Sequence, residues 1–152
     1  TPYRLEMQAK VNIPVSSGKP CKSLYDFWGR SLYDELSRDD HVILNLASKE
    51  YSKCIEGYLT EEDRFITCVF AEEVKGKNDR NEKIDVQDKS AQKSKLVQKG
   101  TLAKMARGEM VRFLAERKAE RPEEAKDFDR LGFAFCEKVS SDREYVFVKE
   151  QS

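Results

Sequence analysis

Two short apolar runs set the architecture expected of this 152-residue chain. Residues 41–46 are rich in β-branched side chains, and residues 64–74 (RFITCVFAEEV) carry a nearly continuous apolar stretch. Runs of this length and composition are typical of buried strands, whereas a helix that crosses a bilayer needs roughly 20 consecutive apolar residues. The pattern therefore predicts a sheet, and it argues against a membrane-spanning role.

Helical periodicity surrounds these two runs. After Ser23, apolar residues recur at spacings of three and four, which predicts one amphipathic helix with a single buried stripe that includes Trp28. That stripe consists of Leu24, Phe27, Trp28, Leu32 and Leu36. Residues 48–55 predict a further helix with Ser48 as its N-cap, and residues 101–119 predict a long one.

The remaining strands complete the expected fold class. Residues 96–97 resume a strand, and two closing strands are expected at 132–136 and 144–149. Strands and helices mix without regular βα alternation, so we expect an α+β (mixed α/β) fold. It would consist of a mixed sheet packed by a few helices, including one long, basic-faced helix near 101–119.

Charge and cysteine content exclude several classes of function. The 28 Lys and Arg residues balance 28 Asp and Glu residues, so a wholly basic nucleic-acid protein is not indicated, although cations can still gather on one surface. The four cysteines form no Cys-x-x-Cys pair and His41 is the only histidine, so we expect no metal site and no cofactor. The chain shows no basic and apolar leader, which favours the cytoplasm.

The long helix carries an unusual glycine beside two cations. At 100° per residue, Lys104, Arg107, Gly108 and Val111 share one face, and Arg112 flanks it. Glycine inside a helix costs roughly 1 kcal/mol relative to alanine, so its presence needs a reason. Either a ligand approaches this face closely, or Gly108 packs tightly against a neighbouring helix while both cations are solvated.

Further polar residues occupy positions that suit either a functional site or a structural role. Arg4 and Glu6 alternate with apolar neighbours in an extended segment, so both can point to one face. Asn45 ends a predicted strand, and Ser48, Glu50 and Tyr51 begin the helix that follows it. Their structural roles would be an internal ion pair and a helix cap, and periodicity does not decide between the two interpretations.

Four sequence blocks resemble the YaaA family of peroxide-stress proteins, in the family's order and at similar spacing except for an insertion near residues 78–94. The blocks are PYRLEM at 2–7, LYDFWG at 24–29, NLASKEY at 45–51 and ARGEMVR at 106–112. The resemblance extends over essentially the whole chain, and residues 128–133 and 140–147 also fit it. It implies that 1–152 is the C-terminal portion of a single YaaA-like domain whose N-terminal part is missing. Residues 75–94, with excess Lys and Arg, would then be a flexible insertion loop.

The resemblance also implies a function. The family is associated with peroxide stress, with limiting free intracellular iron, and with DNA binding through a positively charged cleft. Transferred to this sequence, the cleft cations would be Arg4, Lys10, Lys104, Arg107 and Arg112. The polar residues beside them would be Glu6, Asn45, Ser48, Glu50 and Tyr51. Met105 stands where a second basic residue is often found, and Gln8 where many members have glycine, which reduces the expected charge of the cleft.

Two mechanisms follow from these residues. In the first, the protein is not an enzyme, and its cations bind phosphates of duplex or distorted DNA, selecting shape rather than sequence. In the second, the same cleft is an enzyme site for a small anionic or nucleotide-like ligand, with Glu6 or Glu50 as acid or base. The chain contains no phosphate loop, nucleophile elbow or metal signature, which favours the first mechanism.

Overall fold

The computed structural model describes residues 6–7, 9–15, 18–74 and 95–150 of the chain. The chain divides into two compact units. The first unit comprises Thr1–Ile43 and Ala47–Phe65, and the second comprises Leu44–Leu46 and Ile66–Ser152. The predicted insertion at 75–94 lies outside the described residues.

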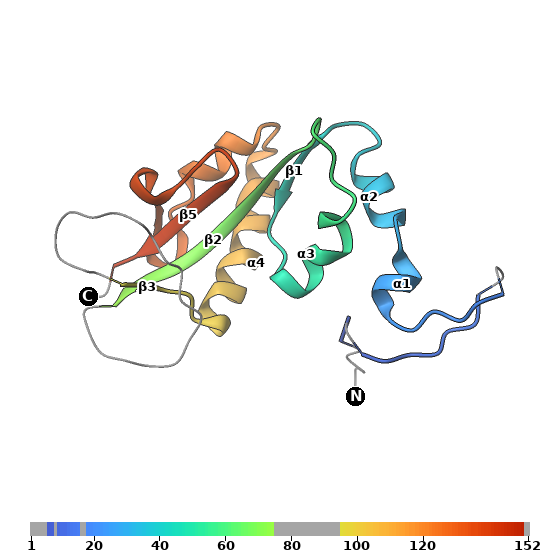
Figure 1. The fold of residues 1–152 in the computed structure, drawn as a ribbon. Helices are drawn as coiled ribbons and strands as arrows, with labels where there is room; N and C mark the ends of the chain where they lie inside the picture. The colour runs from blue at the N-terminus through green and yellow to red at the C-terminus, as the bar shows by residue number, and fades with distance from the viewer. Residues whose placement is uncertain (1–5, 8, 16–17, 75–94, 151–152) are drawn as a thin grey trace. The chain divides into compact units, whose positions relative to one another are not determined.

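The strands form a mixed five-stranded sheet in the order β1-β2-β5-β4, with β3 also paired to β2. The strands are β1 (Val42–Asn45), β2 (Arg64–Val74), β3 (Lys95–Val97), β4 (Phe133–Phe135) and β5 (Glu144–Lys149). β2 runs parallel to β5, whereas β3 is antiparallel to β2 and β4 is antiparallel to β5. Figure 1 shows β2 as the longest strand, beside the red β5. The predicted α+β fold with a mixed sheet is confirmed.

The second unit has a dry aromatic core. Alternate residues of β2, Ile66, Cys68 and Phe70, are at most 2 % exposed. The Phe70 ring stacks on Phe147 of β5, with 5.0 Å between the ring centroids. The other buried rings meet edge to face, an arrangement worth about 0.5–1.5 kcal/mol per pair beyond the area that is buried. Apolar packing is therefore a main source of stability in this unit.

The long helix α4 (Gly100–Arg117) contributes the helical wall of this core. It buries a stripe at helical spacing that consists of Ala103, Ala106, Met110 and Phe113, as the periodicity predicts. The helix ends at Lys118, which adopts the left-handed conformation (φ 50°) and whose N–H bonds back to the last turn. The 3₁₀ helices η1 (Pro122–Asp127), η2 (Arg130–Gly132) and η3 (Glu137–Val139) connect the remaining elements.

The first unit has a smaller core with more polar contacts. Its buried side chains include Tyr33, Ile43, Cys54 and Ile55. They come from α2 (Ser31–Leu36), β1 and α3 (Lys49–Glu56). Ser48 is the N-cap of α3, as predicted, but its side chain makes no capping hydrogen bond.

The prediction of one long helix after Ser23 is wrong. The chain instead forms α1 (Leu24–Trp28) and then α2, because Gly29 (φ 47°) ends α1 after five residues. The prediction that Trp28 lies in the core is wrong as well. Trp28 is 40 % exposed and Phe27 is 44 % exposed, and α1 has no buried residue. The single apolar stripe that the spacing indicates is therefore split between two short helices.

Within the described part of the chain, each helix is too short or too polar to cross a membrane. The strands at 41–46, 64–74, 96–97, 132–136 and 144–149 are all present to within two residues at either end. The long basic-faced helix is also present, so the elements that position the candidate site are those the sequence predicts.

Candidate functional site

Positive and negative side chains are distributed unevenly across the exposed face of α4. At 100° per residue, Gly108 lies opposite the buried stripe of the helix, at the centre of the exposed face. On one side of Gly108 lie Lys104, Arg107 and Val111, with no carboxylate among them. We call Lys104, Arg107, Gly108 and Val111 the basic stripe. On the other side, Glu109 and Glu116 alternate with Met105 and Arg112.

Arg107 is the member of the basic stripe with the most unusual environment. Its side chain is half-buried, and its Nε atom is buried with no hydrogen-bond partner within the described residues. Burial lowers the pKa of the guanidinium, because desolvation disfavours the charged form. An unsatisfied buried donor costs about 1–3 kcal/mol, or more when charged, so the surroundings of Arg107 leave its guanidinium incompletely satisfied.

Lys104 lies about one turn before Arg107 and is exposed. Neither cation has a carboxylate within ion-pair distance in the part of the chain that the structure describes. Unpaired cations one turn apart on a helix suit successive oxygens of a polyanion. The basic stripe therefore presents two positive charges that the second unit does not itself neutralise.

Gly108 faces open space. A Cβ atom placed on Gly108 would have no atom within 4 Å among the described residues outside its own neighbourhood. Tight packing against a neighbouring helix therefore does not explain this glycine in the described structure. Approach of a ligand, the other explanation that the sequence leaves open, requires a surface without a side chain, and Gly108 supplies one.

The opposite side of α4 is neutralised internally. Arg112 Nε lies 2.8 Å from Glu116 Oε1, so the structure pairs this predicted cleft cation with a carboxylate one turn later. Arg130 of η2 contacts Glu116 at 2.5 Å and Glu109 at 3.3 Å. Hydrogen bonds from Arg130 and Arg112 lower the pKa of Glu116. A phosphate would have to compete with Glu116 for Arg112, whereas no carboxylate among the described residues competes for Arg107.

The other predicted site residues divide between the two units. Asn45, in the second unit, is buried and donates from Nδ2 to Thr67 Oγ1 at 3.2 Å. In the first unit, Glu6 and Lys10 are exposed, and Tyr51 is 37 % exposed. Arg4 lies outside the described residues.

Glu50 has a structural role in the first unit. Its Oε1 accepts the Met7 N–H at 3.1 Å, and its carbonyl oxygen accepts the Tyr25 hydroxyl at 2.6 Å. Ser48 acts through its own carbonyl, which accepts the N–H groups of Tyr51 and Ser52. These contacts fasten the N-terminal segment and α1 to the start of α3.

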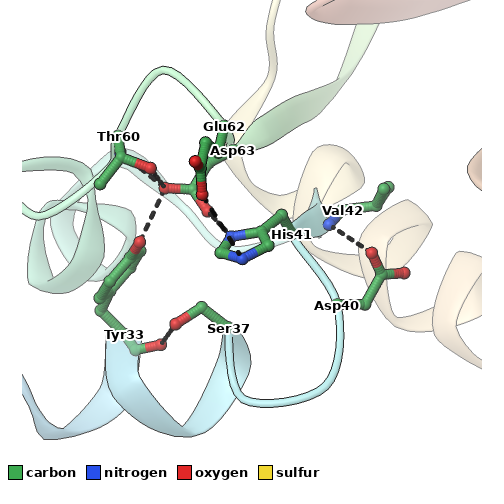
Figure 2. A network of polar contacts seen from close by, with 8 residues as sticks. All are labelled: Tyr33, Ser37, Asp40, His41, Val42, Thr60, Glu62 and Asp63. Carbon is green, nitrogen blue, oxygen red and sulfur yellow. Dashed lines mark hydrogen bonds and ion pairs between the residues drawn. The ribbon is translucent and has the colours of Figure 1, made fainter.

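Sequence reasoning missed a polar network centred on Asp63, which Figure 2 shows. Its Oδ1 accepts His41 Nδ1–H at 2.8 Å, while its Oδ2 accepts the Tyr33 hydroxyl at 2.8 Å. The same Oδ2 accepts the backbone N–H and the hydroxyl of Thr60 at 2.6 and 2.9 Å. We call Tyr33, His41, Thr60 and Asp63 the Asp63 network. The spacing Thr60-x-x-Asp63 is the one local signal that could have indicated part of it.

Electrostatics in the Asp63 network keep the carboxylate ionised. The Asp63 side chain is wholly buried, and hydrogen bonds led by the Thr60 N–H hold its pKa well below the usual range. The hydrogen bond to Asp63 raises the pKa of His41, whose ring is half exposed. The network links α2, the start of β1 and the turn before β2. Its geometry indicates a structural role, in which it holds these three segments together.

The sulfur atoms of the chain lie mostly inside it. Cys54 and Cys68 are buried, and burial raises the pKa of both thiols, that of Cys68 to about 12. Met7 and Met110 are also buried, whereas Met105 is 54 % exposed. Within the described residues, no three His, Cys, Asp or Glu side chains are grouped closely enough to hold a metal ion.

Comparison with known proteins gives one consistent result. A family model described as "Peroxide stress protein YaaA" matches residues 1–139. A UPF0246 protein of Lachnoclostridium phytofermentans is 51 % identical over 152 residues, which are 100 % of this chain and 51 % of the relative. A UPF0246 protein of Agathobacter rectalis is 49 % identical over 150 residues, 99 % of this chain and 51 % of the relative. The chain therefore spans about half the length of these curated relatives.

Proposed function

This chain belongs to the YaaA family of peroxide stress proteins, and from this premise we propose that it binds DNA through the basic stripe of α4. The observation that carries the proposal is that Lys104 and Arg107, one turn apart, have no carboxylate within ion-pair distance among the described residues. Phosphate oxygens would supply the missing negative charge, and a guanidinium can hold a phosphate with two parallel hydrogen bonds.

The geometry of the stripe favours a long anion over a compact one. Lys104 and Arg107 lie one turn apart, with the side-chain-free surface of Gly108 beside them. A DNA backbone could pass over Gly108 and offer a phosphate to each cation, releasing counterions as it binds. Phosphates are the same in every sequence, so cations that contact only the backbone would select the shape of the duplex rather than its bases.

In the cell, this binding would serve the peroxide-stress response by helping to limit DNA damage linked to free intracellular iron. The net charge of zero is compatible with this role, because Glu109 and Glu116 lie on the other side of the helix from the basic stripe. The role predicts that a binding-deficient variant fails to restore peroxide resistance to a strain that lacks the protein.

The direct test compares Arg107→Ala with Arg112→Ala. Fluorescence anisotropy of a labelled duplex, measured over a salt series, gives both the affinity and the number of phosphates contacted. We expect Arg107→Ala to weaken binding about tenfold or more, as loss of a charge-assisted hydrogen bond does. The slope of log K against log salt should also fall by about 0.9.

Arg112→Ala is the matched control, because it removes the same side chain from the same helix at a position already paired with Glu116. We expect it to change affinity and salt slope only slightly. An equal loss in the two variants, or an unchanged salt slope for Arg107→Ala, would contradict the proposal. Two duplexes of unrelated sequence should bind alike, while a bent or gapped duplex should bind more tightly.

A further inference from the structure

The strongest feature that this function leaves unexplained is a pair of exposed aromatic rings on α1. Phe27 and Trp28 pack edge to face with 5.3 Å between centroids, and they are 44 % and 40 % exposed. Each ring of this kind can bury about 150–250 Å² of surface, so leaving about two-fifths of each residue exposed to water forfeits part of the available stabilisation. Neighbouring exposed rings of this size are typical of interaction sites.

The two rings cannot turn inward, because the other face of α1 is already engaged. Leu24 and Tyr25 pack against the buried cluster of the first unit. The Tyr25 hydroxyl also donates to the Glu50 carbonyl at 2.6 Å, which fixes the orientation of the helix. Gly29 then ends α1 at once, so Phe27 and Trp28 are held on the outer surface.

The charges around the pair argue against DNA as its occupant. Arg30 is the only cation in residues 24–36, and its Nε lies 2.7 Å from Asp34. The same residues include Asp26 and Glu35, so this surface is acidic overall. An apolar protein surface fits such a pair better than a polyanion does.

The greater length of the relatives' chains points to a source for such an apolar protein surface. This chain covers 51 % of its Lachnoclostridium relative, so the relative has about as many residues again outside the matched region. We propose that Phe27 and Trp28 are the docking surface for the half of the YaaA-family chain that lies outside this matched region. Docking would bury both rings at the centre of the contact, where aromatic side chains contribute most.

Trp28 reports directly on this proposal, because it is the only tryptophan in the chain. The test uses a chimera in which this chain replaces the matched region of the Lachnoclostridium relative, with any tryptophan in the other half changed to phenylalanine. We expect the emission of Trp28 to shift to shorter wavelength in the chimera, and quenching by acrylamide to fall severalfold relative to the chain alone. Unchanged emission and quenching in a folded chimera would overturn the proposal.

A second measurement covers the case in which the chimera does not fold. The unmatched half is co-expressed with this chain, and we expect the two to copurify as a one-to-one complex. The double variant Phe27→Ser, Trp28→Ser should lose the complex, whereas Met105→Ser, which changes a still more exposed apolar residue in the second unit, should keep it. Equal loss with both variants, or no soluble complex and no soluble chimera, would also overturn the proposal.

Two other occupants would be recognised in the same assay. A shift of Trp28 emission that depends on the concentration of the chain alone would mean that a second copy covers the rings. A shift on addition of duplex DNA would mean that nucleic acid does so. Either result would overturn the assignment, and neither depends on whether Arg107 binds DNA.

Discussion

The second unit is stabilised by a large cluster of buried aromatic rings, whereas the first unit has a smaller apolar core and also depends on hydrogen bonds to one buried carboxylate. Phe70 and Phe147 stack at 5.0 Å, and both are at most 1 % exposed. In the first unit, Asp63 accepts four hydrogen bonds, from Tyr33, His41 and Thr60. The aromatic cluster needs no charged group, whereas the Asp63 network depends on the ionised carboxylate of Asp63.

This difference means that the two units can be perturbed independently. Removing a ring leaves a cavity that neighbouring side chains fill only in part, at any pH. Removing a donor from the Asp63 network leaves a carboxylate with one unsatisfied position, and its effect varies with protonation. Amide hydrogen exchange can follow each unit separately, because local opening is reported residue by residue.

The largest expected effect is that of Phe147→Ala in the second unit. A cavity in this core should lower the free energy of unfolding by about 3–5 kcal/mol, as deletion of a buried phenylalanine ring does. Urea unfolding measures the loss, and hydrogen exchange should place it in β2 and β5. Val111→Ala, at a site that is 55 % exposed, is the control. Equal losses in the two variants would break the comparison.

Tyr33→Phe tests the first unit with a smaller expected effect. The variant keeps the buried ring and removes only the hydroxyl that donates to Asp63 at 2.8 Å. We expect a loss of about 1 kcal/mol in the free energy of unfolding, the usual contribution of one hydrogen bond. Tyr58→Phe is the control, because its hydroxyl has no hydrogen-bond partner among the described residues. An equal or larger loss for Tyr58→Phe would show that the hydrogen bond from Tyr33 to Asp63 is not the source of the effect.

Gly108→Ala separates stability from binding on α4. Because a Cβ atom meets open space at this position, the variant should gain about 0.5–1 kcal/mol of stability from helix propensity alone. If a DNA backbone lies against Gly108, the same variant should bind DNA more weakly. Ala115→Gly, the reverse change on the same exposed face, should lose stability and keep its affinity. Tighter binding by Gly108→Ala would contradict the proposed approach of DNA over this residue.

The smallest expected effect is the pH dependence of the first unit near neutrality. Its cause is His41, which faces Asp63, Glu62 and Asp40 and whose pKa is raised by the hydrogen bond to Asp63. A raised pKa means that its contribution is complete below the unfolded value of about 6.5 and is lost as pH rises through the folded value.

Exchange of the Arg64 amide, which donates to the His41 carbonyl at 2.7 Å, measures this effect. Protection of that amide should fall as pH rises through the folded pKa of His41, after correction for intrinsic exchange. The change should be slight, because the imidazole ring is half exposed to water. His41→Gln should remove it, and a pH dependence that persists in this variant would assign it to another group.

Much of the fold could be predicted from the sequence, because its strands and long helix are specified locally. Residues 65–71 form a nearly continuous apolar run that includes β-branched side chains, and α4 repeats apolar residues at helical spacing. The break between α1 and α2 could not be predicted in this way. Spacing alone does not show that Gly29 adopts a positive φ, or that Tyr25 and Tyr33 each find a partner distant in sequence.

The candidate site shows the same division. The shared face of Lys104 and Arg107 follows from helical geometry, and the pairing of Arg112 with Glu116 follows from a spacing of four. The contacts of Arg130 with Glu109 and Glu116 span 21 and 14 residues, so only the folded chain brings them together. The absence of such a partner for Arg107 among the described residues is likewise a property of tertiary structure.

The exposure of the cysteine and methionine side chains determines which of them an oxidant can reach, which matters for a member of a peroxide stress family. The thiol of Cys68 is 2 % exposed and fully protonated at neutral pH, so it is a poor nucleophile toward an oxidant. Met110 is equally sheltered, whereas the thioether of Met105 is open to solvent on α4. Oxidation would thus begin at the partly exposed thiols of Cys21 and Cys136 and at Met105, and it would leave the buried sulfur atoms intact.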